Sequence, residues 1–187
     1  MIEKASHEVL KSKNTPDFIE TFKRARKLFK GKLYIMTYAN VPFGYGLEKF
    51  AASVEKADGI IIADLPLVES RRFEEVFTRY NLNLIHFVTP ESSFKEIDAV
   101  KRRSKEFIYF VSVRGTTGGK FMIDEETKRK VRYARMGFHV PVILGFGIRT
   151  REDIERACEI SDGVVIGSEA IRAINRGSFK EYIESIM

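Results

Sequence analysis

The sequence has 187 residues, of which 44% are hydrophobic and 31% are charged, and its formal net charge is +6. This composition is typical of a globular protein, and a chain of this length can bury a substantial core. No apolar run approaches the roughly 20 residues that a membrane-spanning helix needs, and the first residues do not resemble a signal peptide. A single cysteine, Cys158, excludes an internal disulfide and suits a reducing compartment. We therefore expect a cytoplasmic protein with no membrane partner.

Short β-rich runs alternate with amphipathic segments, which is the pattern of βαβ units around a parallel sheet. After a helical start at 1–14, the expected elements in chain order are a helix at 15–29, a strand at 33–38, a helix at 47–55, a strand at 59–63, a helix at 70–80, a strand at 83–88, a helix at 93–103, a strand at 107–113, a helix at 125–136, a strand at 140–145, a helix at 150–159, a strand at 163–166, and helices at 168–175 and 178–186. Most of the strands are nearly continuous apolar runs, as in strands that are buried on both faces. The sequence thus predicts an α/β fold of the (β/α)8 TIM-barrel type, present as an incomplete barrel of about six parallel strands with outer helices.

Two of these strands end in glycine. Gly145-Phe146-Gly147 follows the strand at 140–145, and Gly167-Ser168 follows the strand at 163–166 and opens a helix. At such strand ends the backbone N–H groups can face a ligand without a Cβ in the way, and a helix N-terminus attracts anions. The pattern indicates a phosphate site. Judged by local spacing alone, ordinary strand-to-helix turns explain these glycines equally well.

The charge and the remaining reactive side chains indicate no other chemistry. The densest basic run, 101–103, is accompanied by no nucleic-acid-binding motif, so we interpret it as a solvated helix face and expect no nucleic-acid partner. His7, His86 and His139 follow no metal-ligand or nucleophile spacing, and we expect no metal site. Cys158 lies in an expected helix and should pack as a small hydrophobic residue.

Five segments, each at the C-terminal end of an expected strand, resemble the tryptophan synthase alpha subunit family. They are Ile35-Met-Thr-Tyr-Ala-Asn40, Ala63-Asp-Leu-Pro66, 107–112 with Gly115-Thr-Thr-Gly118, Leu144-Gly-Phe-Gly-Ile148 and Val165-Ile-Gly-Ser168. The resemblance extends over essentially all of residues 1–187 and implies a single partial TIM-barrel domain with strands three to eight of the family barrel. It also implies a lyase of tryptophan biosynthesis that cleaves indole-3-glycerol phosphate to indole and glyceraldehyde 3-phosphate. The expected partner is a beta subunit in an alpha-beta-beta-alpha complex, and pyridoxal phosphate is expected only in that beta subunit, with no cofactor in this chain.

The resemblance assigns roles to particular residues. Phosphate binding is expected from Gly145, Gly147, Gly167 and Ser168. Glu169 departs from the family, where this position is usually small. A carboxylate near a phosphate weakens binding unless it points to solvent, which a side chain in the first helical turn can do.

Substrate contacts are expected from Tyr38, Tyr109, Thr117, Gly118 and Phe146. The segment at 115–119 resembles the family's mobile loop, in which Thr117 meets the ligand when the loop closes. A flexible surface loop explains the same glycines, and core packing is an equal alternative for Tyr38.

The partner interface is expected to include Asn40, Pro42, Asp64 and Pro66, which lie at strand ends. A simple capped turn explains Asp64-Leu-Pro66 equally well.

The family's catalytic residues are a glutamate on the second strand and an aspartate in the following loop. The resemblance begins just after that loop, so neither carboxylate has a counterpart, and Glu3 falls on an outer helix. We therefore expect no catalytic residue and almost no cleavage by residues 1–187 alone.

Two other functions fit these observations. The first is a non-catalytic regulatory subunit that binds a phosphorylated ligand and activates a beta subunit. The second is another phosphate-binding barrel enzyme, such as a phosphosugar isomerase or a prenylglyceryl-phosphate synthase. The Gly-Thr-Thr-Gly and Tyr-Ala-Asn segments argue against this second alternative.

Overall fold

The computed structural model describes residues 15–111, 123–137 and 140–187. The chain divides into two compact units, Met1–Leu84 and Ile85–Met187, and the boundary between them falls within strand β3 (Asn83–Val88). No helix in these described ranges is long and apolar enough to cross a membrane.

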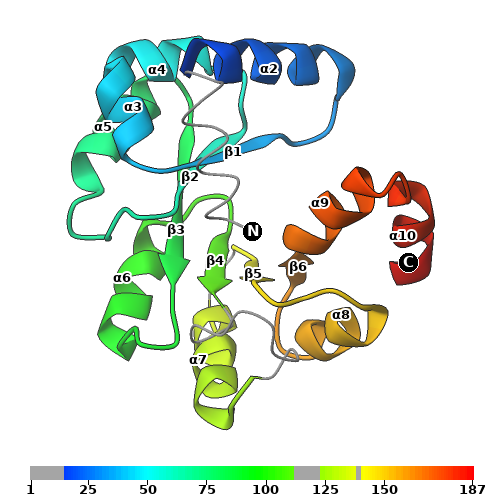
Figure 1. Ribbon diagram of the computed structural model, residues 1–187. Coiled ribbons are helices and arrows are strands. Elements are labelled where there is room, and N and C mark those ends of the chain that lie inside the picture. The colour runs from blue at the N-terminus through cyan, green and yellow to red at the C-terminus, as the bar shows by residue number, and fades with distance from the viewer. Residues whose placement is uncertain (1–14, 112–122, 138–139) are drawn as a thin grey trace. The chain divides into compact units, whose positions relative to one another are not determined.

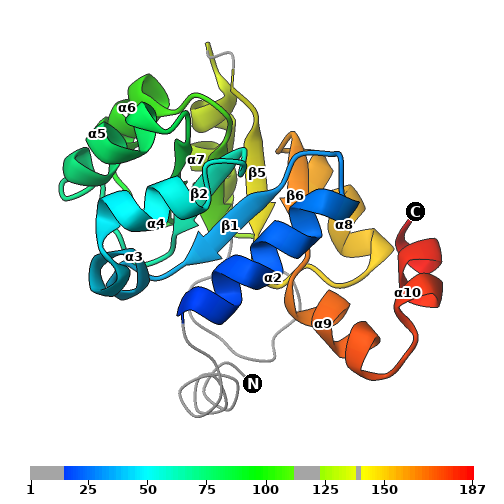
Figure 2. The same cartoon turned by 90° about the horizontal axis from the view of Figure 1, so that it is seen from above.

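The first unit is built on two parallel strands, β1 (Tyr34–Thr37) and β2 (Gly59–Ile62), which pair in register over their full length. Its helices are α2 (Thr15–Leu28), α3 (Asn40–Tyr45), α4 (Leu47–Ser53) and α5 (Arg71–Arg79). Both views of the cartoon place α3 beside α4 and α4 beside α5 (Figures 1 and 2). All four positions of β2 are buried, as its continuous apolar run predicts.

The short helix α3 was not among the elements expected from the sequence. Proline weakens a helix interior, but Pro42 is the third residue of α3. In the first turn its missing N–H has no intrahelical acceptor in any case, so the proline is tolerated there.

The second unit contains the parallel strands β3, β4 (Ile108–Val111), β5 (Val142–Gly145) and β6 (Gly163–Val165), each paired with the next. Its helices are α6 (Phe94–Arg103), α7 (Glu125–Arg135), α8 (Arg151–Cys158), α9 (Ser168–Asn175) and α10 (Phe179–Ile186). Helix α7 packs on β5 and α8 on β6, and α10 packs on both α8 and α9 (Figure 1). Within the described ranges from residue 15 onward, the expected alternation of strands and helices is confirmed, with boundaries shifted by one or two residues.

Two expectations about the second unit are wrong. Lys101 is buried rather than solvated, and its Nζ donates to the carbonyl oxygens of Tyr133 at 3.2 Å and Met136 at 2.7 Å. The last carbonyl groups of a helix lack intrahelical donors, so the C-terminus of α7 draws this ammonium inward. Cys158 is exposed, because the buried position at this end of α8 is the preceding residue, Ala157.

An aspartate ties together the starts of the two strands in the first unit. The Asp58 carboxylate accepts hydrogen bonds from the N–H of Leu33 at 2.7 Å and from the guanidinium of Arg26 at 3.1 Å, while the Asp58 N–H donates to the Leu33 carbonyl. The next residue is Gly59. A Cβ at this position would lie only 2.8 Å from the carbonyl oxygen of Asn83, which explains why the residue is glycine. We call this arrangement of arginine, aspartate and strand-start N–H the Arg–Asp clasp.

The same clasp recurs in the second unit. The Asp162 carboxylate accepts from the N–H of Val142 at 2.8 Å and from the guanidinium of Arg135 at 2.9 Å, and Gly163 follows it. Here the clasp joins the starts of β5 and β6. Because the same type of hydrogen bond occurs at both places, we infer that each clasp helps to set the register of the strands that it joins.

Helix α6 begins with a capping box whose strength depends on pH. The Ser93 hydroxyl accepts from the Glu96 N–H, and the Glu96 carboxylate accepts from the N–H of Ser93 at 2.7 Å and from its hydroxyl at 2.8 Å. The Ser93 N–H, and then its hydroxyl, hold the pKa of Glu96 below its ordinary value. The ionised form is thus the one that folding favours. Its contribution to stability is complete above the ordinary glutamate pKa and is lost as the pH falls through the lowered one.

Replacing Glu96 with alanine is therefore expected to cost about 1 kcal/mol of unfolding free energy at pH 7 and less at pH 3. Urea unfolding at both pH values measures this difference. Glu91, which precedes the helix, provides a control substitution outside the box. An effect of Glu96→Ala that is equal at both pH values would contradict the ionic origin of the contribution.

Candidate functional site

Tyr109 of β4 and Gly145 of β5 are in close contact near the end of the sheet in the second unit. In register, Tyr109 pairs with Ile143, and its ring reaches along β5 to Gly145. A Cβ on Gly145 would lie 1.9 Å from the Tyr109 Oη and 2.2 Å from its Cζ, so only glycine fits. The Phe87 ring packs on the other side, 5.0 Å from the Tyr109 ring between centroids.

Tyr109 is only 3% exposed, and its burial raises the pKa of the hydroxyl above the ordinary tyrosine value. A tyrosine hydroxyl is already protonated at neutral pH, and the upward shift of its pKa acts in the same direction. It is a hydrogen-bond donor held at the end of β5 by a rigid ring.

The chain leaves β5 through two successive residues with left-handed backbone. Phe146 has φ of 78° and Gly147 has φ of 81°. This conformation costs a non-glycine residue on the order of 1 kcal/mol or more, and such strain tends to occur at functional sites. It leaves the Phe146 ring half-exposed while Ile148 turns back into the core. Two interactions then fix the other end of this turn. Thr150 and Asp153 form a capping box, and the Arg149 N–H donates a hydrogen bond to the Asp153 carboxylate.

The register of β5 and β6 brings the two glycine-rich ends to the same level. Gly145 pairs with Val165, so Gly147 and Gly167 each lie two residues beyond a paired position on neighbouring parallel strands. Gly167 has φ of −106°, and a Cβ there would meet no described atom within 4 Å. Neither the backbone conformation nor packing against the described residues therefore requires glycine at position 167.

Gly167 is the N-cap of α9 and provides no side-chain cap, and Ser168 is the first residue of the helix. The first helical hydrogen bond runs from the Ile171 N–H to the Gly167 carbonyl. The N–H groups before Ile171 thus face the open end of the helix, where the positive end of the helix dipole favours an anion.

Glu169 is the acidic residue nearest to this helix end in sequence. Its carboxylate pairs with Arg172, three residues along the same helix, and its side chain is 21% exposed. The ion pair directs the negative charge along the helix and partly neutralises it, so Glu169 does not occupy the end of α9.

The structure thus collects six of the expected site residues in the second unit: Gly145, Gly147, Gly167, Ser168, Tyr109 and Phe146. Thr117 and Gly118 lie outside the described residues. One residue that sequence reasoning missed is Tyr182 of α10, whose hydroxyl donates to the Arg149 carbonyl at 3.0 Å and so braces the turn after β5. No motif marks Tyr182, because the contact joins positions 33 residues apart.

The other expected residues, Tyr38, Asn40, Pro42, Asp64 and Pro66, lie in the first unit. Tyr38 is 52% exposed, so core packing within the described residues does not account for it. The Asp64 carboxylate accepts a hydrogen bond from the Ala39 N–H at 2.7 Å and ties the ends of β1 and β2 together. Asn40 and Pro66 are exposed, whereas Pro42 is buried within α3.

The described residues contain six parallel strands that are joined by helices, and two neighbouring strands have glycine-rich ends. This arrangement defines an α/β protein of the (β/α)8-barrel class. Solved structures share this fold. The tryptophan synthase subunit alpha from Campylobacter jejuni matches with a TM-score of 0.77 and 28% identity, over 91% of this chain and 68% of that one. The fold also matches a structure of the tryptophan synthase a2b2 complex from Pyrococcus furiosus, with a TM-score of 0.87 and 24% identity over 99% of this chain and 79% of that one. The expected fold class is thereby confirmed.

A family model described as tryptophan synthase alpha chain matches residues 1–185. The tryptophan synthase alpha chain of Staphylococcus epidermidis is 32% identical over 181 residues, which is 96% of this chain and 69% of the relative. The alpha chain of Methanocaldococcus jannaschii is 31% identical over 94% of this chain and 64% of the relative. The chain belongs to the tryptophan synthase alpha chain family, a family of lyases, and the expected resemblance is confirmed. This membership sets aside the phosphosugar isomerase and prenylglyceryl-phosphate synthase alternatives.

Proposed function

We propose that this chain binds indole-3-glycerol phosphate and serves as the alpha subunit of a tryptophan synthase. The phosphate group would lie between the ends of β5 and β6, in a phosphate cup made of Gly145, Gly147, Gly167 and Ser168. The observation that carries this proposal is the level register of Gly147 and Gly167, with the open N-terminus of α9 following directly. Backbone N–H groups and the Ser168 hydroxyl would donate to the phosphate oxygens.

The indole ring would lie beside Phe146 and Tyr109. The half-exposed Phe146 ring offers a stacking surface, and the strained turn holds it at the strand end. The Tyr109 hydroxyl is protonated at neutral pH, as tyrosine ordinarily is, and can donate a hydrogen bond toward the ligand. Thr117 and Gly118 belong to the loop that would close over the substrate.

Retro-aldol cleavage also needs a base for the glycerol hydroxyl and an acid for the indole carbon. Two described carboxylates that follow strand ends are already engaged, since Asp64 accepts from the Ala39 N–H and Glu169 pairs with Arg172. We therefore expect residues 1–187 alone to bind the substrate but to release almost no indole. An indole-release assay tests this, and robust turnover would contradict it.

A binding experiment tests which ligand the proposed site accepts. Calorimetric titration should show that indole-propanol phosphate, which cannot be cleaved, binds more tightly than simple sugar phosphates. Because residues 1–187 are themselves expected to bind with almost no indole release, only clear indole release would exclude the regulatory alternative. Equal affinity for all phosphates would contradict a site built for indole.

Gly167→Ala is expected to leave stability unchanged or slightly higher while weakening ligand binding by about tenfold or more. The added methyl meets no described atom and removes backbone freedom from the unfolded chain, which stabilises by about 0.4–1 kcal/mol at permissive positions. It would, however, displace the phosphate from charge-assisted hydrogen bonds to N–H groups, each worth about 1.5–3 kcal/mol. Titration with indole-propanol phosphate and urea unfolding measure the two effects.

Gly44→Ala is the matched control, because a Cβ at Gly44 also meets no described atom within 4 Å and this residue lies outside the phosphate cup. It should leave binding unchanged. If Gly167→Ala bound the ligand as tightly as Gly44→Ala, the phosphate would not approach position 167.

The partner proposed for this chain is a tryptophan synthase beta subunit, which is consistent with its similarity to chains of the a2b2 complex from Pyrococcus furiosus. The exposed side chains of Asn40, Asp64 and Pro66 would meet that subunit, and Pro42 would act from within α3 by shaping the helix. Pyridoxal phosphate would be held by the beta subunit.

A further inference from the structure

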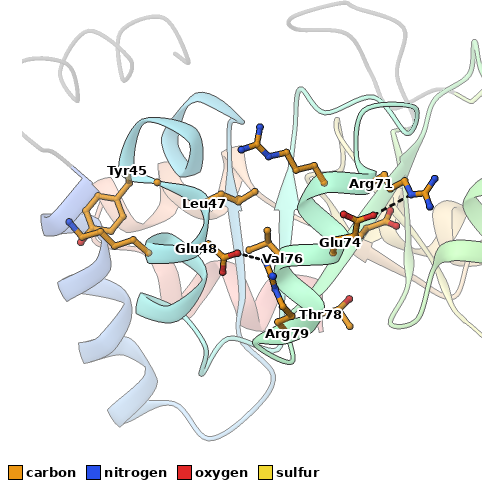
Figure 3. Close-up of a pocket in the computed structure, with 12 residues that line it drawn as sticks. Tyr45, Leu47, Glu48, Arg71, Glu74, Val76, Thr78 and Arg79 are labelled. Atoms are coloured by element: carbon orange, nitrogen blue, oxygen red, sulfur yellow. Dashed lines mark hydrogen bonds and ion pairs between the residues drawn. The ribbon is translucent and has the colours of Figure 1, made fainter.

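An open groove of about 1110 Å³ runs between α4 and α5 on the outer helical face of the first unit. Leu47 of α4 and Val76 of α5 lie between the two helices in the close-up view, and both are 7% exposed (Figure 3). Charged side chains line the sides of this groove. Its size suits a stretch of polypeptide rather than a single ion, and its residues differ from those at the strand ends.

Two ion pairs account for part of the charge. Arg79 of α5 pairs with Glu48 of α4 and so connects the two helices across the groove, as Figure 3 shows. Arg71 pairs with Glu75 on the same helix at 3.3 Å. In both pairs the cation and the carboxylate neutralise one another, so neither pair attracts a ligand of one sign.

Two cations in the groove are held differently. The Lys49 Nζ lies 4.4 Å from the centre of the Tyr45 ring, and the Arg72 guanidinium lies 5.6 Å from the centre of the Phe43 ring. Among the described residues, neither cation has a carboxylate partner. A ring face orients a cation without neutralising it, so both remain available to an external carboxylate.

Arg72 also connects the groove to the proposed partner surface. Its ring partner Phe43 belongs to α3, the helix that begins at Asn40, and is 48% exposed. The Phe43 ring is fixed from beneath by an edge contact with Phe73, at 4.9 Å between centroids. A partner segment that meets Asn40 can therefore continue over Phe43 into the groove without leaving the surface of the first unit.

We propose that this groove binds an acidic segment of the beta subunit, with carboxylates on Lys49 and Arg72 and apolar side chains over Leu47 and Val76. The proposal rests on the proposed function only in taking the beta subunit as the partner. It extends the interface from the strand ends to the outer helices. Four basic and three acidic residues line the groove, and Glu74, the carboxylate outside the two ion pairs, accepts a hydrogen bond from the Ser70 hydroxyl. The excess positive charge therefore lies with Lys49 and Arg72, and it makes an acidic segment the complementary occupant.

The test is the double variant Lys49→Glu with Arg72→Glu, titrated with the tryptophan synthase beta subunit from the same source. Both side chains are exposed, so the variant should fold, as circular dichroism can verify. We expect the dissociation constant to rise by about tenfold or more and the association rate to lose much of its dependence on salt. Lys23→Glu with Lys27→Glu on α2 is the matched control, because it changes the net charge equally at two exposed positions outside the groove.

The outcomes distinguish failure of the groove assignment from failure of the proposed partnership. If the groove variant and the α2 control bind the beta subunit equally, the groove is not part of the interface, although the partnership stands. If the unmodified chain binds no beta subunit, the proposed partnership fails, and the groove assignment fails with it. If the groove variant abolishes self-association in sizing chromatography without changing beta binding, the occupant is a second copy, which also overturns the proposal.

Discussion

Replacing Gly145 with alanine is expected to destabilise the second unit by about 1–3 kcal/mol and to abolish detectable binding of indole-propanol phosphate. The added Cβ would lie 1.9 Å from the Tyr109 Oη, so either the Tyr109 ring or the end of β5 must move. The ring cannot turn aside freely, because it is 3% exposed and packs against Phe87. Displacing the end of β5 would also move Phe146 and Gly147 at the proposed site. Urea unfolding and calorimetric titration measure the two losses.

A double-mutant cycle with Tyr109→Leu shows whether the clash is the cause. Leucine lacks the hydroxyl and the ring atoms that a Cβ on Gly145 would meet, so Gly145→Ala should cost little in the Tyr109→Leu background. Gly167→Ala is the control alanine in the same unit, since it meets no described atom. Equal costs of Gly145→Ala in both backgrounds would contradict the packing explanation.

The chain path in the second unit could be predicted because its signals are local. Continuous apolar runs mark β3 to β6, and the Thr150 and Asp153 pair that suggested the start of α8 does form a capping box. The contact of Tyr109 with Gly145 could not be predicted in the same way. It depends on the register of two strands joined by a long crossover, which residue patterns do not specify. The positive φ of Phe146 is also invisible in the sequence, since glycine is the residue that usually signals that conformation.

The wrong expectations have a common physical origin. Lysine and cysteine were interpreted from the helices on which they lie, but neighbouring elements decide their burial. Lys101 is buried because the C-terminus of α7 offers it two carbonyl groups. Cys158 is exposed because Ala157 occupies the inward position of α8. The family resemblance predicts that the site residues of the first unit and those of the second unit belong to one site. That arrangement stays a prediction.

Asp162→Ala is expected to cost about 2–3 kcal/mol of unfolding free energy, far more than removing its ion-pair partner. The substitution leaves the Val142 N–H without its acceptor in a residue that is fully buried, and an unsatisfied buried donor costs about 1–3 kcal/mol. The ion pair with Arg135 adds little, because the Arg135 side chain is 38% exposed. Arg135→Ala should therefore cost less than about 1 kcal/mol, and Asp162→Asn, which keeps an acceptor oxygen, should lie between the two. Urea unfolding of the three variants gives the order.

Asp162→Ala should also weaken ligand binding, because Asp162 helps to set the register of β5 and β6. The Asp162 clasp fixes where these strands start relative to one another, and the same register places Gly147 level with Gly167 at their other ends. Asp162→Ala should thus speed hydrogen exchange at the Val142 amide and weaken indole-propanol phosphate binding, whereas Asp58→Ala, which opens the equivalent clasp in the first unit, should destabilise without either effect. Equal losses from Asp162→Ala and Arg135→Ala would show that the ion pair, and not the strand-start hydrogen bond, holds the clasp. Both clasps hold a strand-start N–H with an aspartate, but only the Asp162 clasp joins β5 and β6, so the comparison assigns the effect on binding to the register of these two strands.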